Sequence, residues 1–298
     1  MTDSPGPAAA AGAAEAAAGA AAAEDLEQRG ADKDRLVDLL GAEWSAIADL
    51  LADLPAEEWS ATVLPGWDVH DVLAHMLGTE CALSGMNLPP VPDGAPGADH
   101  VRNDIGKVNE AWVVSRRGVS HEDLLAEFVA ITAQRLASLR TMSVEDFYAP
   151  SWTPAGPGTY ARFMQIRVFD CWMHEQDIRT AVGRPGNESG AAAERSLDEV
   201  VGALGYIIGK RGRAPDGSSV LIRLTGPIER DLHVIVEGRA RATDKLDGAP
   251  TATITLSSSL FLRLAGGRED PEASPEPVKL DGDLELARQL ATNLAFTI

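Results

Sequence analysis

The chain has 298 residues, a formal net charge of −19 and a composition that is 45% hydrophobic and 24% charged. This length predicts two domains, and the negative charge argues against nucleic acid or an anionic membrane as a partner, because both carry charge of the same sign. With only two cysteines and no apolar run near the roughly 18 residues of a membrane span, we expect a cytoplasmic protein without a disulfide framework.

Residues 1–30 are rich in alanine and have neither the basic start nor the leucine-rich core of a secretion signal. We predict that this segment is a disordered Ala-rich tail without a chemical role. From Asp32 onward, leucine, isoleucine and tryptophan recur at three- and four-residue spacing. That spacing predicts a first amphipathic helix, which ends near Pro55.

Four further helices are predicted before residue 186. Pro65 and Gly66 break the chain, and Asp68 is placed to cap the helix that follows them. After a Pro/Gly loop, residues 101–118 and 120–142 have helical patterns, and the segment "APSWTPAGPG" is a second loop. The last helix runs from about Thr159 to "GRPG". The economical arrangement for residues 31–186 is an all-α bundle of four principal helices.

The pattern changes after the bundle, and we place the domain boundary near residues 184–192. Short alternating runs separated by turn residues predict strands, and helical patterns lie around them. The predicted helices are residues 197–212, 258–267 and 283–296, and the predicted strands are residues 219–226, 231–238, 252–257 and 277–282. Mixed short strands and helices predict a small α+β domain with an antiparallel sheet over residues 190–298.

The segment "RVFDCWMHEQDIR" carries the most informative chemistry. At about 100° per residue, a helix places Arg167, Asp170, His174 and Asp177 on one stripe, while apolar residues occupy nearly every other direction. Such a helix is expected to be buried, where an unpaired charge costs several kcal/mol. The stripe therefore needs a partner, either a bound cation or a network of ion pairs.

His75 is the candidate third ligand, because it lies in the apolar part of another predicted helix. His70 is five residues away, about 140° around that helix, so the two histidines cannot meet at one ion. Two imidazoles and one carboxylate suit Zn²⁺ and leave a coordination position open, as in catalytic sites. The alternative is that His75 is a satisfied core histidine and that Asp170 and His174 form a salt bridge.

Several segments together resemble one known family. They are "LPGWDVHDVLAHMLGTE", "RNDIGKVNEAWV", "IRVFDCWMHEQDIRTAVGRPG" and "FLRLAGGRED…VKLDGDLELARQLATNLAFT". In this order they are similar to the mycothiol-dependent maleylpyruvate isomerase family over roughly residues 32–298. The resemblance implies a DinB-like metal-binding helical bundle followed by a sterol-carrier-like domain. It also implies that a divalent metal, usually zinc, is bound by His75, His174 and the acid at position 170, where the family has Glu and this chain has Asp.

The resemblance further implies a metalloenzyme that uses mycothiol as its thiol cosubstrate. The mycothiol sulfur would take the open position and become a thiolate, which attacks a small electrophile. The enzyme would then isomerise a maleylpyruvate-like substrate or act as an S-transferase. Arg167 and Asp177 are candidate supporting residues, and we expect a monomer or homodimer. The alternative is a non-enzymatic metal- or small-ligand-binding protein with a vestigial site, which the shorter acid at Asp170 favours.

Overall fold

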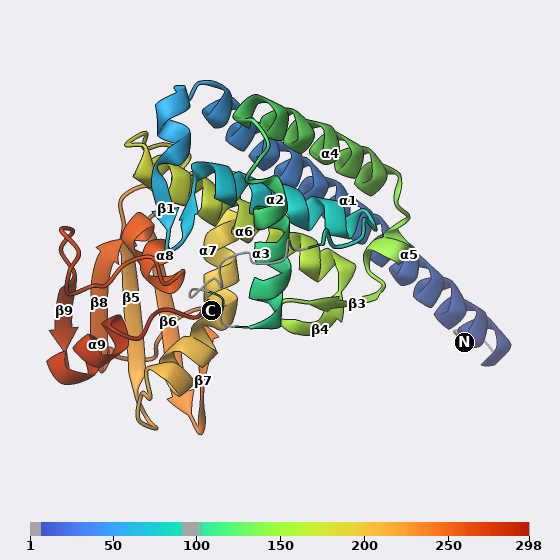
Figure 1. Ribbon diagram of the computed structural model, residues 1–298. Coiled ribbons are helices and arrows are strands. Elements are labelled where there is room, and N and C mark those ends of the chain that lie inside the picture. The colour runs from blue at the N-terminus through green and yellow to red at the C-terminus, as the bar shows by residue number, and fades with distance from the viewer. Residues whose placement is uncertain (1–6, 91–100, 102, 298) are drawn as a thin grey trace, which may run out of the picture.

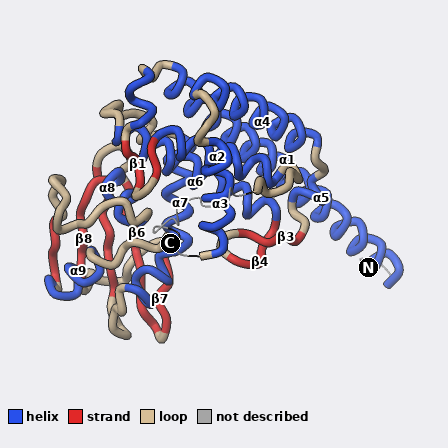
Figure 2. Tube along the Cα trace, in the orientation of Figure 1, coloured by secondary structure: helices blue, strands red, loops and turns tan. Residues whose placement is uncertain are grey.

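The computed structural model describes the backbone of residues 7–90, 101 and 103–297, and the side chains of these ranges from residue 24 onward. The helices before residue 182 gather on one side, and the larger sheet lies on the other side together with further helices that pack on it (Figures 1 and 2). This division agrees with the predicted order of a helical part and a mixed part. None of the helices in the described ranges is long and apolar enough to cross a membrane.

Five helices of at least 13 residues form the helical part within the described residues. They are α1 (Pro7–Ala52), α2 (Val69–Leu83), α3 (Asp104–Arg116), α4 (His121–Thr141) and α6 (Tyr160–Ala181). Helix α1 packs on α4 and α6, while α2 packs on α3, α4 and α6. A bundle of four principal helices was predicted, whereas five helices of this length occur in the described part of the chain. Helix α3, which lies against α2, falls within residues 101–118, a segment that was predicted to be helical. Helix α1 starts inside the stretch that we expected to be a disordered tail, so residues 7–30 are helical.

Short elements connect these helices. They are a 3₁₀ turn (Ala56–Ser60), α5 (Val144–Phe147), and two hairpins formed by β1 (Thr62–Leu64) with β2 (Trp67–Asp68) and by β3 (Pro150–Thr153) with β4 (Gly156–Thr159). The segment "APSWTPAGPG", which we predicted to be a loop, therefore contains most of the second hairpin. Its proline and glycine residues indicate a turn, but they carry little sign of the strands on either side.

Side-chain caps fix where the helices begin. Asp68 accepts a hydrogen bond from the backbone N–H of Asp71 at the start of α2, which confirms the predicted cap. Ser120 caps α4 in the same way, and Thr159 caps α6 through the N–H of Arg162. Each cap satisfies one of the backbone donors that have no partner in the first turn. Helices α2 and α6 carry the candidate ligands, and the local sequence thus defines where each of these helices begins.

The C-terminal part is a five-stranded sheet of order β7-β6-β5-β8-β9 with three accompanying helices. The strands are β5 (Ser219–Thr225), β6 (Arg230–Glu237), β7 (Arg239–Thr243), β8 (Ala252–Ser257) and β9 (Lys279–Gly282), and the helices are α7 (Ala191–Leu204), α8 (Ser258–Ala265) and α9 (Leu284–Ala291). Three strand pairs are antiparallel, but β5 and β8 are parallel, so the prediction of an antiparallel sheet is wrong for that pair. The chain adds β6 and β7 on one side of β5 and then crosses to its other side.

Strand β7 and a change of helix type were not predicted. The sequence "RARAT" is mostly exposed at the edge of the sheet, so it lacks the apolar alternation of a buried strand. The predicted helix over 197–212 is α7 followed by a π-helix, Gly205–Arg211. A Cβ atom at Gly205 would lie 2.7 Å from the carbonyl oxygen of Ala240 in β7, which requires glycine at this close approach.

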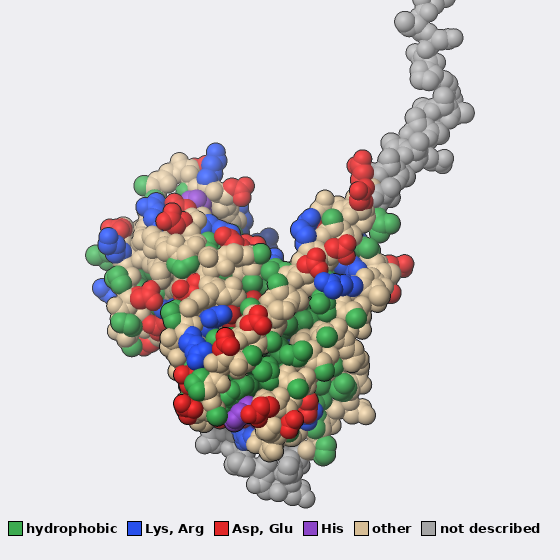
Figure 3. Space-filling model, turned by 90° about the horizontal axis from the view of Figure 1, so that it is seen from above, with side chains coloured by type: hydrophobic (Ala, Val, Ile, Leu, Met, Phe, Trp, Pro, Cys, Tyr) green, Lys and Arg blue, Asp and Glu red, His purple; other side chains and the backbone are tan. Residues whose placement is uncertain are grey.

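Helix α6 joins the two parts. Phe169, Trp172 and Met173 belong to the hydrophobic core that fills the sheet part, while Val168 and Cys171 belong to the core of the helical part. A helix that packs against neighbours on both sides has apolar residues in nearly every direction, as predicted. Seen from above, the face in Figure 3 carries acidic and basic side chains interspersed around a group of hydrophobic ones.

A pair of buried carboxyl groups lies where α1, α6 and the linker after α6 meet. Glu43 and Glu175 are 1% and 0% exposed. Asn187 donates hydrogen bonds to both, 2.5 Å long to Oε2 of Glu175 and 3.4 Å long to Oε2 of Glu43. Burial, and then repulsion by Glu175, raises the pKa of Glu43 to about 9. Glu43 therefore keeps its proton at neutral pH and can donate a hydrogen bond to Glu175.

This raised pKa predicts the pH dependence of stability. Above the ordinary glutamate pKa of 4.5 the unfolded chain loses the proton of Glu43, while the folded chain keeps it up to about pH 9. The free energy of unfolding should therefore fall as pH rises through this window, by at most about 1.4 kcal/mol per pH unit. Glu43→Gln removes the titration and keeps a donor, so we expect a flatter profile in urea unfolding. The control is Glu27→Gln, an exposed glutamate of α1. An unchanged slope in Glu43→Gln would contradict the assignment.

Candidate metal centre

The three predicted ligands converge from two helices. His75 comes from α2, and Asp170 and His174 come from α6, with one donor atom of each lying within 4.8 Å of the others. His75 Nε2 is 3.7 Å from Asp170 Oδ2, and His174 Nε2 is 3.7 Å from Asp170 Oδ1. The centres of the two imidazole rings are 4.9 Å apart. The structure thus brings together the residues that the sequence singled out.

The group is buried but is not sealed on every side. The side chains of His75 and His174 are 6% and 8% exposed, whereas that of Asp170 is 31% exposed. The carboxylate is therefore the member that a small molecule can reach from outside. The ring of Trp67 lies beside that of His75, with ring centres 5.2 Å apart.

Asp177 holds the imidazole of His174 in place. His174 Nδ1 lies 3.1 Å from Asp177 Oδ2, which leaves Nε2 directed toward Asp170. Asp177 in turn accepts hydrogen bonds from Arg268, in the segment after α8, with Nη2 3.0 Å from Oδ2. Burial opposes the charged form of Asp177, but His174 and Arg268 hold its pKa below its usual range. A carboxylate behind an imidazole is the arrangement that orients histidine ligands in metal sites.

Arg167 is the second predicted supporting residue, and it is only 2% exposed. It forms an ion pair with Asp170, and its Nε donates a 2.9 Å hydrogen bond to Oε1 of Glu80. Arg135 donates to the other oxygen of Glu80 at 3.0 Å. Glu80 and Arg135 were not singled out from the sequence, although an acid in the apolar stretch "AHMLGTEC" is a signal for a buried partner.

The charges set the protonation states of two candidate ligands. Burial opposes ionisation of Asp170, but Arg167 and the two histidines outweigh it and hold the pKa of Asp170 well below its usual range. Burial lowers the pKa of His75, although Asp170 acts in the opposite direction. At neutral pH the site therefore contains an ionised carboxylate and a neutral His75 imidazole, which are the forms that bind metal ions.

The residues fit a divalent metal ion. The 3.7 Å separations exceed the ordinary hydrogen-bond length of at most about 3.2 Å. Ligand atoms around zinc, with bonds of about 2.0–2.1 Å, lie roughly 3.3–3.5 Å apart in tetrahedral geometry, so a small adjustment would suit an ion. The donor set of two nitrogens and one oxygen is one that zinc accepts. Asp170 also forms an ion pair with Arg167, so a network of ion pairs without a metal is the alternative role of this carboxylate.

A second acidic group at the start of α2 is a weaker candidate. Asp68, His70 and Asp71 also place donor atoms within 4.8 Å of one another. Each of them already has a structural partner: Asp68 caps α2, His70 contacts the backbone oxygen of Val119 at 3.0 Å, and Asp71 pairs with Arg117. His70 belongs to this group and not to that of His75, as the helical geometry predicted.

Cys171 is next to Asp170 but lies in the core. Its side chain is fully buried, and Nη2 of Arg167 is 3.3 Å from its sulfur. Burial raises the pKa of this thiol, although Arg167 acts in the opposite direction. The thiol therefore stays protonated and cannot act as a nucleophile, and Cys171 is a small residue of the core.

Comparisons with known proteins match most of the chain. Residues 40–179 match the family model described as "Mycothiol maleylpyruvate isomerase N-terminal domain", and residues 194–289 match "MDMPI C-terminal domain". No curated protein gives a significant match. A crystal structure of the mycothiol-dependent maleylpyruvate isomerase is similar at 14% identity and a TM-score of 0.54, with 83% of this chain and 92% of that chain covered. A histidine-to-alanine mutant of that isomerase gives 16% identity, the same TM-score, and coverages of 80% and 90%.

Proposed function

Because the chain belongs to the mycothiol-dependent maleylpyruvate isomerase family, we propose that it is a divalent-metal-dependent enzyme with mycothiol as its thiol cosubstrate. In this proposal His75, Asp170 and His174 bind the metal, most simply Zn²⁺. The reaction is isomerisation of a maleylpyruvate-like electrophile or transfer of the thiol to it. The observation that supports the proposal most strongly is the convergence of these three donors from two helices.

Each residue of the site has a distinct part in this proposal. His75 and His174 offer Nε2, and Asp170 offers a carboxylate oxygen at the exposed edge of the group. Asp177, held by Arg268, orients His174. Arg167 compensates the negative charge of Asp170 and limits its movement. A bound divalent cation would supply Lewis acidity, which lowers the pKa of a thiol that it coordinates.

A reactive thiol determines which reactions the substrate can undergo. Addition of the mycothiol sulfur to an activated double bond leaves a single bond, about which the substrate rotates. Elimination of the same thiol restores the double bond in its other geometry, and no thiol is consumed. If the adduct is released instead, the enolate carbon formed by the addition takes up a proton while the C–S bond is kept, and the reaction is an S-transfer. Because the thiol comes from the cosubstrate, the chain needs no reactive cysteine of its own, in agreement with the buried Cys171.

A non-enzymatic binding protein is the second candidate, and the ion pair between Arg167 and Asp170 favours it. An arginine on the acid supplies positive charge that a metal would otherwise provide. Asp170 is also one methylene shorter than the glutamate of the family pattern, so its carboxylate reaches less far. On this hypothesis the three donors are a vestigial or purely structural group.

The two candidates are separated by metal content and thiol-dependent turnover. The purified protein, reconstituted with Zn²⁺ and dialysed, should retain about one divalent ion per chain in elemental analysis. Maleylpyruvate should then isomerise in the presence of mycothiol, with glutathione as the control thiol, and loss of free thiol should report S-transfer. A protein that binds metal but accelerates neither reaction would support the second candidate. A protein that retains no metal would refute the metal centre itself.

A further inference from the structure

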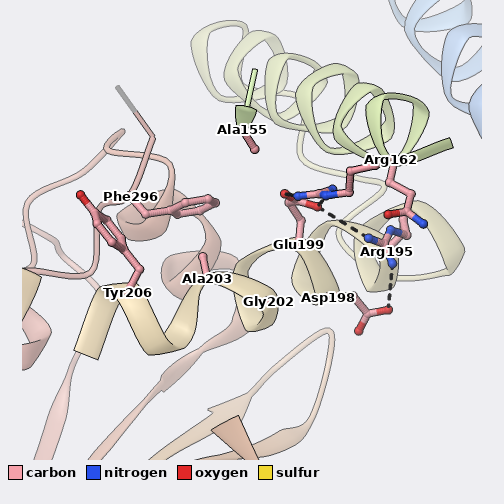
Figure 4. A pocket seen from close by; sticks show the side chains of 10 residues that line it. Ala155, Arg162, Arg195, Asp198, Glu199, Gly202, Ala203, Tyr206 and Phe296 are labelled. Atoms are coloured by element: carbon pink, nitrogen blue, oxygen red, sulfur yellow. Dashed lines mark hydrogen bonds and ion pairs between the residues drawn. The ribbon is translucent and has the colours of Figure 1, made fainter. Parts of the chain in front are cut away.

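A cavity separate from the candidate metal centre lies between α6, α7 and the C-terminal segment (Figure 4). Its volume is about 650 Å³, which is within the range of roughly 300–1,000 Å³ that small-molecule sites occupy. None of His75, Asp170 and His174 is among the described residues that line it. The lining residues that matter here are Arg162, Arg195, Asp198, Glu199, Tyr206 and Phe296.

Charged side chains gather at one end of this cavity, and most of them are already paired. Both oxygens of Glu199 accept hydrogen bonds from Arg162, at 2.6 Å and 2.5 Å. Asp198 accepts a 2.8 Å hydrogen bond from Arg230, outside the cavity lining. The hydrogen bonds of Glu199 and Asp198 are therefore made with Arg162 and Arg230, respectively.

Arg195 forms only long ion pairs with these two acids, and it has no hydrogen bond to them. Its Nη2 is 3.6 Å from Glu199 and its Nη1 is 3.9 Å from Asp198, so both contacts are too long for hydrogen bonds. Its Nε is buried without a hydrogen-bond partner among the described residues. The side chain is 26% exposed, so its outer nitrogens are within reach of a ligand. An arginine whose donors lack partners at the wall of a cavity is suited to a planar anion such as a carboxylate.

The other end of the cavity is aromatic. Figure 4 shows Tyr206 and Phe296 next to each other, away from the arginines. Tyr206 is 46% exposed, which is high for a large aromatic side chain. The ring of Phe296 packs against that of Phe169, with ring centres 5.9 Å apart. A firmly held ring beside an exposed one can bind a flat apolar group, because burial of aromatic surface is favourable.

We propose that this cavity is a second small-molecule site, which binds a monocarboxylate joined to an aromatic or other flat apolar group. Arg195 binds the carboxylate, and Tyr206 and Phe296 hold the apolar part. The neighbouring Asp198 and Glu199 disfavour a ligand with two or more negative charges, such as a phosphate, because repulsion grows with the charge. This inference does not depend on the proposed function, since it uses no residue of the metal centre.

The test is calorimetric titration of the full-length protein with 3-phenylpropionate, and with 3-phenyl-1-propanol as the uncharged comparison. We expect the acid to bind and the alcohol to bind at least about tenfold more weakly. Arg195→Met should weaken binding of the acid by a similar factor. Arg241→Met, at an exposed arginine that pairs with Glu237 on the sheet edge, is the matched control and should leave binding unchanged.

Gly202→Leu provides a second variant that does not touch the charges. A Cβ atom at Gly202 would meet no atom within 4 Å, so a leucine should fill the cavity without disturbing the fold. Loss of binding in this variant and in Arg195→Met, with unchanged thermal unfolding, would support the proposal. It would be overturned if the wild-type protein did not bind the acid, or if Gly202→Leu bound it as well as the wild type. Binding that is lost in His174→Ala but kept in Arg195→Met would place the acid at the metal centre and would also overturn it.

Discussion

Replacement of His75 or His174 by alanine is expected to remove the divalent ion and, with it, thiol-dependent turnover. Each substitution leaves two of three protein ligands, and one of them, Asp170, already shares its charge with Arg167. Loss of one ligand should lower metal affinity by well over the 10–100-fold that loss of an orienting partner costs. Elemental analysis after dialysis against a weak chelator measures the effect directly, and turnover with mycothiol should fall to the rate of the metal-free wild type.

The control for this experiment is His233→Ala, because His233 lies on β6 in the sheet, far along the chain from the three donors. It should keep both metal and turnover. Circular dichroism and thermal unfolding of the metal-free proteins check that the buried alanines have not unfolded the helical part. If either His75→Ala or His174→Ala retained a full equivalent of metal, the ion would be bound elsewhere, and the proposed ligand set would be wrong.

The three candidate ligands could be singled out from the sequence because the constraints on their positions are local. Asp170 and His174 share one face of a helix by spacing alone, and His75 stands out as a histidine in an apolar stretch. The cap of α2 at Asp68 has the same local origin. What brings the two helices together is the packing of their apolar faces, and the pattern of those faces is also visible in the sequence.

The partners behind the ligands could not be predicted in this way. Arg167 meets Glu80 across 87 positions, and Asp177 meets Arg268 across 91 positions of the chain. Neither contact follows from spacing along a helix, because both contacts depend on how the helices and domains pack together. The parallel pairing of β5 with β8 has the same cause, because the direction of a strand is set by the route of the chain and not by its own side chains.

Arg167→Met is expected to lower the free energy of unfolding of the metal-free protein by about 3–5 kcal/mol, the usual cost of removing one partner from a buried ion pair. Arg167 is buried between Glu80 and Asp170, and Glu80 is 0% exposed. The substitution leaves Glu80 with Arg135 and removes the arginine partner of Asp170. Urea unfolding measures the change. Arg223→Met, which breaks an exposed pair with Asp231, is the matched control and should cost at most about 1 kcal/mol.

The same variant separates the metal centre from a purely ionic network. If Asp170 binds a divalent ion, Zn²⁺ supplies the positive charge that Arg167→Met removes. Zn²⁺ at a concentration of 100 times its Kd would stabilise the folded state by about 2.7 kcal/mol. We therefore expect Zn²⁺ to restore a large part of the lost stability in Arg167→Met and none of it in the double variant Arg167→Met/His174→Ala. Equal costs for Arg167→Met and Arg223→Met would show that the buried network does not stabilise the fold. In Arg167→Met the carboxylate of Asp170 no longer pairs with an arginine and is available to a metal ion. If Zn²⁺ still does not stabilise this variant, Asp170 is a partner of Arg167 in the wild type and not a metal ligand.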